Sequence, residues 1–207
     1  MEPYDSFAAL RANEIEGADY RIRFRCGRSG IAVMAVHGGG IEPGTTEIAE
    51  AVAGRAHSFY SLSGLKPSGN ARLHISSRKF DEPLGIDMAA HARTVVTIHG
   101  CRDAKVMTYL GGRHHQLRQT IRTALERGGF PVADSRRFPG VNPKNICNKN
   151  QSGMGVQLEI SIGMRRLLFQ DITRLRRKRV TIAFFAYTHA LQEGIKSEVR
   201  ARSNLAG

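Results

Sequence analysis

Short runs rich in β-branched and apolar residues alternate along this chain with longer segments whose apolar residues recur at helical spacing. Turn-forming residues bound the short runs, which is typical of β-strands. The expected strands are Tyr20–Cys26, Ile31–Val36, Ser58–Leu62, Ala71–Ile75, Thr94–Ile98, Val106–Leu110 and Val156–Ile160. The expected helices lie around Ile48 and Val52 and over Arg113–Arg127, Arg165–Leu175 and Ile182–Val199. Strands that alternate with helices predict an α/β fold with a mostly parallel or mixed β-sheet flanked by helices.

The length and the turn residues of the chain predict one domain. A chain of 207 residues suits a single medium-sized domain. Proline and glycine mark short loops with no long linker, and internal repeats and low-complexity stretches are absent. We therefore expect residues 1–207 to form a single domain and to act as a monomer.

The sequence predicts no membrane partner. No apolar run approaches the ~20 residues that a membrane-spanning helix needs. The N-terminal stretch MEPYDSFAALRANEIEG is acidic and lacks a basic region followed by an apolar core, so it is not an export signal as written. We therefore expect synthesis in the cytoplasm.

The chain is strongly basic, with 31 Lys and Arg residues against 18 Asp and Glu residues and a net charge of +13. Such a chain attracts polyanions, and on charge alone a nucleic acid or another anionic polymer fits. Aromatic residues make up only 7%, tryptophan is absent, and no helix-turn-helix or zinc-finger spacing occurs, which disfavours nucleic acid. The three cysteines form no C-x-x-C pair, so neither a disulfide framework nor a structural zinc ribbon is expected.

A glycine-rich turn, HGGGIEPGTT, joins an expected strand to an expected helix at residues 37–46. A phosphate-binding P-loop needs lysine where Thr45 stands, and the charge of Glu42 would repel a phosphate held in the loop. A dinucleotide fingerprint fails as well, because Pro43 stands where its third glycine belongs. The turn therefore indicates something other than a nucleotide site.

The same turn brings a histidine and a carboxylate to the end of a strand. His37 ends one expected strand, and the glycines let the chain fold back so that Glu42 approaches it. His99 ends another expected strand and is also followed by glycine, so VHG recurs as IHG. Sites in α/β sheets collect at the carboxyl ends of strands, and two histidines with one glutamate form a known catalytic zinc ligand set. We therefore predict a zinc site at His37, Glu42 and His99.

Glu159 is the candidate general base. It lies in the stretch VQLEIS, in which apolar and polar residues alternate cleanly. A catalytic zinc needs a carboxylate outside its ligands to take the proton of the attacking water. The alternation alone leaves open whether the polar face of this strand meets bulk water or a cleft.

Five stretches, taken in this order, resemble the poly-γ-glutamate hydrolase family, which includes phage enzymes and their relatives in bacterial chromosomes. The resemblance spans most of the chain, and the ordered set is specific although no single piece is. The stretches are VHGGGIEPGTTEIA, SFYSLSG, LHISSRKFDEP, VVTIHGCRD and VQLEISIGMRR.

The resemblance implies a fold and a reaction. The fold is a small version of the zinc carboxypeptidase fold, with a mixed sheet, flanking helices and one Zn²⁺ per chain. The reaction is cleavage of the γ-glutamyl amide bonds of poly-γ-glutamate, an anionic capsule or slime polymer. By position, the zinc ligands fall on His37, Glu42 and His99, and the general base falls on Glu159. The carboxypeptidases themselves use a shorter H-x-x-E spacing, whereas here four residues separate His37 from Glu42.

Basic residues are the candidates for substrate binding. Each repeat of this polymer keeps a free α-carboxylate, which a planar guanidinium binds in a fork. We expect Arg78 and Arg165 to make such contacts, and we expect the basic run RLRRKR at Arg174–Arg179 to be a solvated face. The other histidines are expected to be surface or packing residues: His57, His74, His91, His114, His115 and His189.

Two other functions stay open at this point. The positive charge also suits a nucleic-acid-binding or phage replication-associated protein. A zinc amidase that acts on the γ-glutamyl links of peptidoglycan peptides would use the same ligand set. Without an export signal, contact with an extracellular polymer would follow release by lysis, as the phage resemblance implies.

Overall fold

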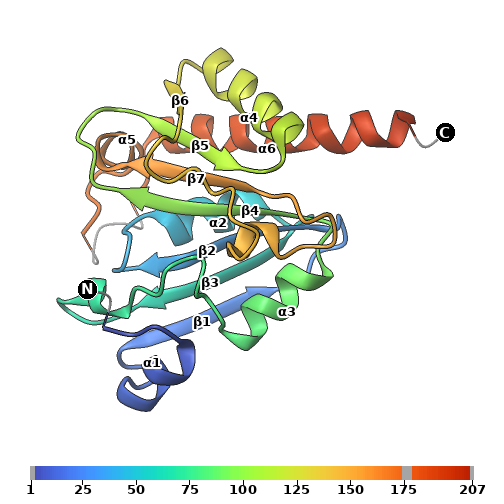
Figure 1. Ribbon diagram of the computed structural model, residues 1–207. Helices are drawn as coiled ribbons and strands as arrows, with labels where there is room; N and C mark the ends of the chain where they lie inside the picture. Colours follow the sequence, from blue (N-terminus) through green and yellow to red (C-terminus); the bar gives the residue numbers. More distant parts are fainter. Residues whose placement is uncertain (1–2, 174–178, 206–207) are drawn as a thin grey trace.

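Within the described part of the chain, seven strands form one mixed sheet in the order β1-β3-β2-β4-β7-β5-β6 (Figure 1). The computed structural model describes residues 3–173 and 179–205. The strands are β1 (Tyr20–Arg25), β2 (Ile31–Gly39), β3 (Ser58–Gly64), β4 (Thr94–Cys101), β5 (Thr108–Gly112), β6 (Val132–Asp134) and β7 (Val156–Ser161). The central strands β3, β2, β4 and β7 are parallel, while β1 and β5 run antiparallel to their neighbours β3 and β7. The predicted mixed α/β sheet is confirmed.

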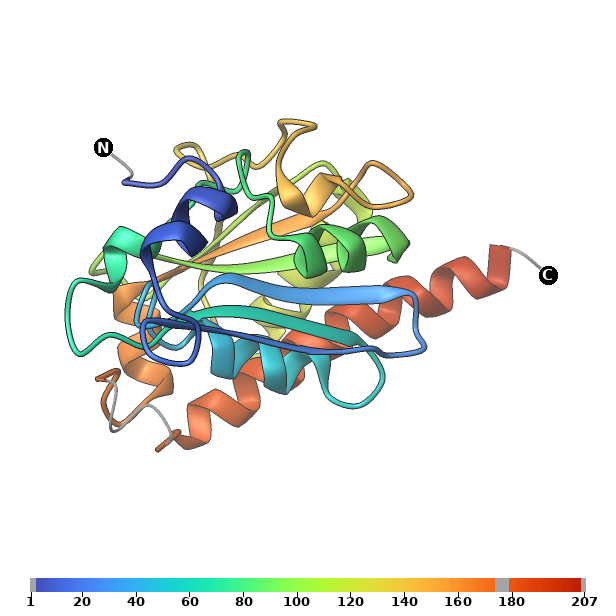
Figure 2. The same cartoon turned by 90° about the horizontal axis from the view of Figure 1, so that it is seen from below.

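Helices cover both faces of the sheet (Figures 1 and 2). One face packs against α2 (Thr45–Ala53), α4 (His115–Arg127), α5 (Ile162–Leu168) and α6 (Ile182–Leu205). The other face packs against α1 (Phe7–Asn13) and α3 (Pro83–His91). Short 3₁₀ turns occupy Asn70–Leu73 (η1) and Ile146–Asn148 (η2). None of the helices within the described residues is long and apolar enough to cross a membrane.

Strand β2 shows why the sequence reads as a continuous apolar run. Val33 and Ala35 belong to the core under α2 and α6, whereas Ala32, Met34 and Val36 belong to the core under α1 and α3. A parallel strand covered by helices on both faces has no solvated side, so both sets of side chains are apolar.

Some expected elements were wrong. Ala71–Ile75 is not a strand: η1 is followed by an extended loop, and Leu73 and Ile75 are buried in the core and pair with no strand among the described residues. The alternating apolar pattern that suggested a strand therefore reflects two loop residues, Leu73 and Ile75, whose side chains are buried in the core. The helix expected over Arg165–Leu175 is α5 and ends at Leu168, and residues 174–178 of the basic run lie outside the described residues.

The helix α3 was not expected, and a contact between its first turn and a distant strand holds it in place. Pro83 is the first helical residue, and the carboxylate of Glu82 caps the helix by accepting hydrogen bonds from the backbone N–H groups of Leu84 and Gly85. Glu82 also accepts a hydrogen bond of 2.6 Å from the hydroxyl of buried Tyr60 on β3. This contact with a distant strand holds a helix of only nine residues in place.

The carboxyl ends of the parallel strands meet at one edge of the sheet, on the left in Figure 1. Strand β2 extends three residues beyond its expected end, through His37, Gly38 and Gly39, with an irregular register between Ala35 and Gly38. This irregular end of β2 carries the glycine-rich turn into α2, so the turn lies beside the end of β4.

Candidate metal centre

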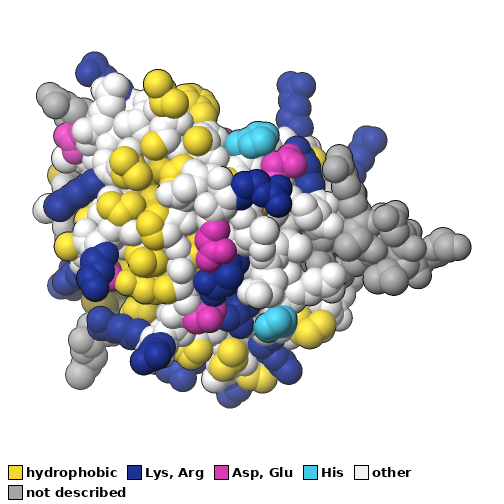
Figure 3. Space-filling model, turned by 90° about the horizontal axis from the view of Figure 1, so that it is seen from above, with side chains coloured by type: hydrophobic (Ala, Val, Ile, Leu, Met, Phe, Trp, Pro, Cys, Tyr) yellow, Lys and Arg dark blue, Asp and Glu magenta, His cyan; other side chains and the backbone are white. Residues whose placement is uncertain are grey.

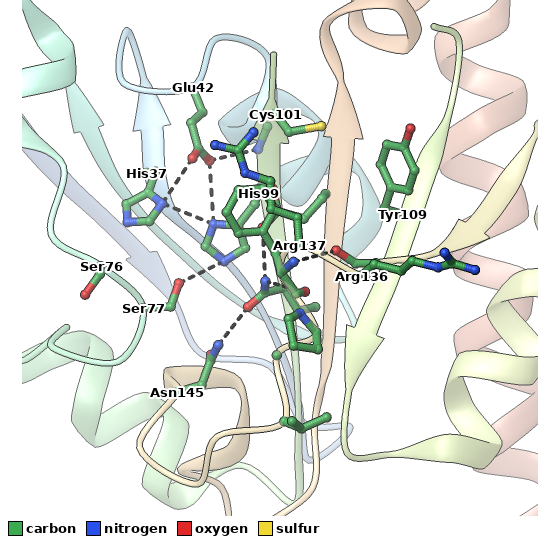
Figure 4. Close-up of a pocket in the computed structure, with 18 of the residues that line it drawn as sticks. His37, Glu42, Ser76, Ser77, His99, Cys101, Tyr109, Arg136, Arg137 and Asn145 are labelled. Atoms are coloured by element: carbon green, nitrogen blue, oxygen red, sulfur yellow. Dashed lines mark hydrogen bonds and ion pairs between the residues drawn. The ribbon is translucent and has the colours of Figure 1, made fainter. Parts of the chain in front are cut away.

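His37 and His99 face each other at the ends of the adjacent parallel strands β2 and β4. Both side chains are buried, each residue being only 2% exposed. Their Nδ1 atoms are 3.1 Å apart, so the two rings present the same nitrogen to a common point (Figure 4).

The glycine turn carries Glu42 back to this point. The backbone N–H of Glu42 donates a hydrogen bond of 3.0 Å to the carbonyl oxygen of His37, which closes the turn. Gly38 is required there, because a Cβ at that position would overlap the hydroxyl oxygens of Thr46 and Ser61. The turn therefore needs glycine at position 38, because the backbone there lies too close to the side chains of Thr46 and Ser61 for any larger residue.

The carboxylate of Glu42 bridges the two imidazoles. Its Oε1 lies 3.3 Å from Nδ1 of His37, and its Oε2 lies 3.6 Å from Nδ1 of His99. The backbone N–H of Gly100 donates a hydrogen bond of 2.8 Å to Oε2. Burial opposes ionisation, but the adjacent His37 and His99 hold the pKa of Glu42 well below its usual range. The carboxylate is therefore charged.

These three donors fit a metal ion. One ligand atom from each of His37, Glu42 and His99 lies within 4.8 Å of the others. Nε2 of His37 lies 2.7 Å from the carbonyl oxygen of Ile75, so Nε2 carries the proton and Nδ1 is left as a ligand. Two imidazole nitrogens and one carboxylate oxygen match the donor set of catalytic zinc sites.

Glu159 lies next to this donor set on strand β7. It pairs in register with His99 on the parallel strand β4, so the two side chains share one face of the sheet. Glu159 is 7% exposed, and burial raises the pKa of its carboxyl to about 7. Nε2 of Gln157 donates a hydrogen bond of 3.0 Å to Glu159, and Gln157 in turn accepts one of 2.8 Å from Nδ2 of Asn145.

The polar face of β7 meets a cleft. Both Gln157 and Glu159 line a cavity of about 1300 Å³ that also contains the three metal-binding candidates. The alternation in VQLEIS, which left this choice open, thus separates a core face from a face toward the cavity.

Arginines from three separate segments line the same cavity. Arg78 lies on the loop between η1 and α3, Arg102 follows β4, and Arg136 and Arg137 lie on the loop after β6. In Figure 4, Arg137 is labelled beside His99, whereas the side chain of Arg136 extends away from the donor set on the side of Tyr109. The predicted candidate Arg78 is therefore at the site, and the loop after β6 adds basic residues that local sequence did not single out.

Arg165 occupies a different kind of place. It is 3% exposed, and its guanidinium donates hydrogen bonds to the carbonyl oxygens of Ile160 (3.1 Å), Pro43 (2.8 Å) and Cys101 (2.9 Å). It is absent from the residues that line the cavity in the described part of the chain. These hydrogen bonds tie the glycine turn to the ends of β4 and β7, which favours a structural role over the predicted contact with substrate.

His74 is a site residue that sequence reasoning placed elsewhere. Its ring lies against that of His37, with centroids 3.9 Å apart and planes tilted by 32°. Its Nε2 is 4.0 Å from Oε1 of Glu42, and the side chain lines the cavity. The sequence placed His74 inside an expected strand, Ala71–Ile75, that does not form, so only the tertiary structure reveals its position.

Comparison with known proteins identifies the family. The family model described as poly-gamma-glutamate hydrolase matches residues 4–190. The chain belongs to the poly-gamma-glutamate hydrolase family. The UPF0714 protein YndL of Bacillus subtilis strain 168 is 34% identical over 199 residues, which are 94% of this chain and 78% of YndL.

Two solved structures show the same fold. A bacteriophage poly-gamma-glutamate hydrolase superposes with a TM-score of 0.93 at 36% identity, covering 96% of this chain and 98% of the phage chain. A zinc-free form of YndL superposes with a TM-score of 0.92 at 32% identity, covering 96% of this chain and 99% of the YndL chain. The family and the superpositions support a hydrolase whose cleft lies at the carboxyl ends of β2, β4 and β7.

Proposed function

We propose that this protein is a zinc-dependent hydrolase that cleaves the γ-glutamyl amide bonds of poly-γ-glutamate. The observation that carries the proposal is the meeting of His37, Glu42, His99 and the buried carboxyl of Glu159 in one cavity of a poly-gamma-glutamate hydrolase family member. The relationship to a YndL chain described as zinc-free in one form supports zinc as the metal.

His37 and His99 would hold the zinc ion through Nδ1, and Glu42 would hold it through its carboxylate. When bound, zinc supplies Lewis-acid polarisation of the scissile carbonyl and acidifies water. The hydrogen bond from His37 to the carbonyl oxygen of Ile75 fixes the tautomer and the ring orientation that this role needs. The bond from Gly100 to Glu42 orients the carboxylate in the same way.

Glu159 acts as the general base. It accepts a proton from the attacking water and then delivers a proton to the departing amine. A pKa near 7 suits a group that must both take and return a proton at neutral pH. Gln157 holds the carboxylate in place, because its amide donates to Oε1 of Glu159.

The arginines of the cavity bind the substrate. Poly-γ-glutamate carries one α-carboxylate for each residue, and guanidinium groups pair with carboxylates in a planar fork. Arg78, Arg102, Arg136 and Arg137 line the cavity from different segments. Lys and Arg side chains are also spread over the face shown in Figure 3, where acidic side chains are fewer. The net charge of +13 raises the local concentration of such a polyanion.

The test is incubation with purified poly-γ-glutamate, with and without a chelator, followed by sizing of the products. We expect shorter chains, with cleavage abolished by zinc removal and restored by added zinc. Glu159→Gln should retain zinc and lose cleavage, whereas the matched variant of an exposed glutamate on α4, Glu126→Gln, should stay active.

Three results would contradict the proposal: cleavage that survives exhaustive chelation, full activity in Glu159→Gln, or a higher kcat/KM on purified cell-wall fragments than on the polymer. The last result would favour an amidase of peptidoglycan peptides. Salt-sensitive DNA binding by a protein that cleaves neither substrate would favour a nucleic-acid-binding protein.

A further inference from the structure

We propose that His74 donates a hydrogen bond to the oxyanion that forms on the attacked carbonyl, an inference that rests on the proposed function. The contacts place His74 and Glu159 at different sides of the donor set. His74 lies against His37, with ring centroids 3.9 Å apart, whereas Glu159 pairs in register with His99. A carbonyl between them would have its base on one side and a hydrogen-bond donor on the other.

His74 is held in place by its neighbours in the sequence. Leu73 and Ile75 are 0% and 1% exposed and belong to the core under α1 and α3. The carbonyl oxygen of Ile75 accepts the hydrogen bond of 2.7 Å from His37, which couples the loop to the donor set. Between these two anchors the backbone of His74 is extended, with φ −73° and ψ 124°. The imidazole is thus preorganised, as a transition-state donor must be.

The distance to Glu42 puts the imidazole within reach of the reacting carbonyl. Nε2 of His74 lies 4.0 Å from Oε1 of Glu42, beyond hydrogen-bond length. The scissile carbonyl would be polarised by the metal ion that His37, Glu42 and His99 would hold, so its oxygen would come close to the same ring. The side chain of His74 is 32% exposed and lines the cavity, so substrate can reach it.

The chemical step defines what His74 does. The water oxygen bonds to the carbonyl carbon, the carbonyl π pair moves to the oxygen, and Glu159 takes the water proton. The N–H of His74 donates to that negatively charged oxygen and keeps its proton. When the C–N bond breaks, the carbonyl re-forms and Glu159 delivers its proton to the amine. Arg165 does not serve this role, because its guanidinium already donates to three backbone carbonyl oxygens and Arg165 does not line the cavity in the described part of the chain.

Two variants separate the hydrogen bond from the ring contact. His74→Phe keeps a flat ring against His37 and removes the N–H, whereas His74→Gln keeps an N–H donor and removes the ring. Removal of one oxyanion donor typically lowers kcat by about 10²–10³-fold. We expect His74→Phe to lose about that factor in kcat with KM changed by less than about twofold. We expect His74→Gln to recover part of it.

Binding measurements add readouts besides activity. Zinc affinity, measured by competition with a chromophoric chelator, should be unchanged in both variants. Calorimetry should show that His74→Phe loses affinity for a γ-glutamyl phosphinate, in which a charged tetrahedral group replaces the scissile amide. That loss should match the loss in kcat, because such analogues report binding of the transition state. The matched control is His91→Phe, which alters an exposed histidine of α3.

Each other outcome contradicts the proposal. Wild-type activity in His74→Phe would show that the N–H is not needed. A fall in zinc affinity that accounts for the lost activity would assign His74 to metal binding. Thermal unfolding of both variants identifies a folding defect, and a fully folded His74→Gln as poor as His74→Phe would also overturn the role. A wild-type protein that releases no amine from the polymer contradicts the proposed function, and the inference with it.

Discussion

The buried guanidinium of Arg165 supports a quantitative prediction that separates a structural role from substrate binding. Arg165→Met removes three hydrogen bonds to the carbonyl oxygens of Ile160, Pro43 and Cys101 while filling most of the same space. Hydrogen bonds to charged groups contribute about 1.5–3 kcal/mol each, and bonds from one side chain are not additive. We expect the free energy of unfolding to fall by roughly 3–5 kcal/mol, a large share of the 5–15 kcal/mol typical of a domain.

The assay is urea unfolding with a chelator present, so that zinc binding to the folded state does not contribute. With a urea slope of about 1–3 kcal/mol/M, the midpoint should fall by at least about 1 M. The matched control is Arg166→Met, because Arg166 is the next residue of α5 and is exposed. The urea midpoint of Arg166→Met should equal that of the wild-type protein within experimental error.

The same pair of variants can refute the structural role. If Arg165 binds substrate instead, Arg165→Met will unfold at the same urea concentration as Arg166→Met and will raise KM. If Arg165→Met does not fold well enough to be purified, Arg165→Lys, which retains a charge but not the fork, should show a smaller fall in the midpoint than the loss of all three bonds implies.

Three further predictions concern the metal centre. Gly38→Ala should lower zinc affinity by more than about tenfold in a chelator competition, because its Cβ would overlap Thr46 and Ser61 and displace the turn that carries Glu42; unchanged affinity would contradict the packing argument. Zinc at 100 times its Kd should stabilise the fold by about 2.7 kcal/mol and raise Tm by roughly 5–10 °C in calorimetry; a Tm that does not respond to zinc or chelator would argue against the site. Gln157→Leu should lower kcat about tenfold with zinc content unchanged, because the amide that orients Glu159 is lost; steady-state kinetics of a folded variant with wild-type kcat would refute this.

Local sequence was enough to predict most of the sheet and the metal-binding candidates. Strands buried on both faces read as continuous apolar runs, and a glycine after a terminal histidine is visible without a structure. The carboxyl ends of parallel strands must meet at one edge, so His37 and His99 could be paired across 62 residues. These inferences use only periodicity and topology.

Other features needed the tertiary structure because they depend on which distant segments touch. Arg78 and Arg165 were equally plausible from the sequence. In the structure Arg78 lines the cavity, whereas the guanidinium of Arg165 donates hydrogen bonds to backbone carbonyl oxygens of three segments. His74 lies in a loop whose path is set by its buried neighbours and by the hydrogen bond between Ile75 and His37. The sequence determined the chemical groups and the strand ends that carry them. Packing decided which of those groups face the cavity, because burial of each loop depends on contacts far away in the chain.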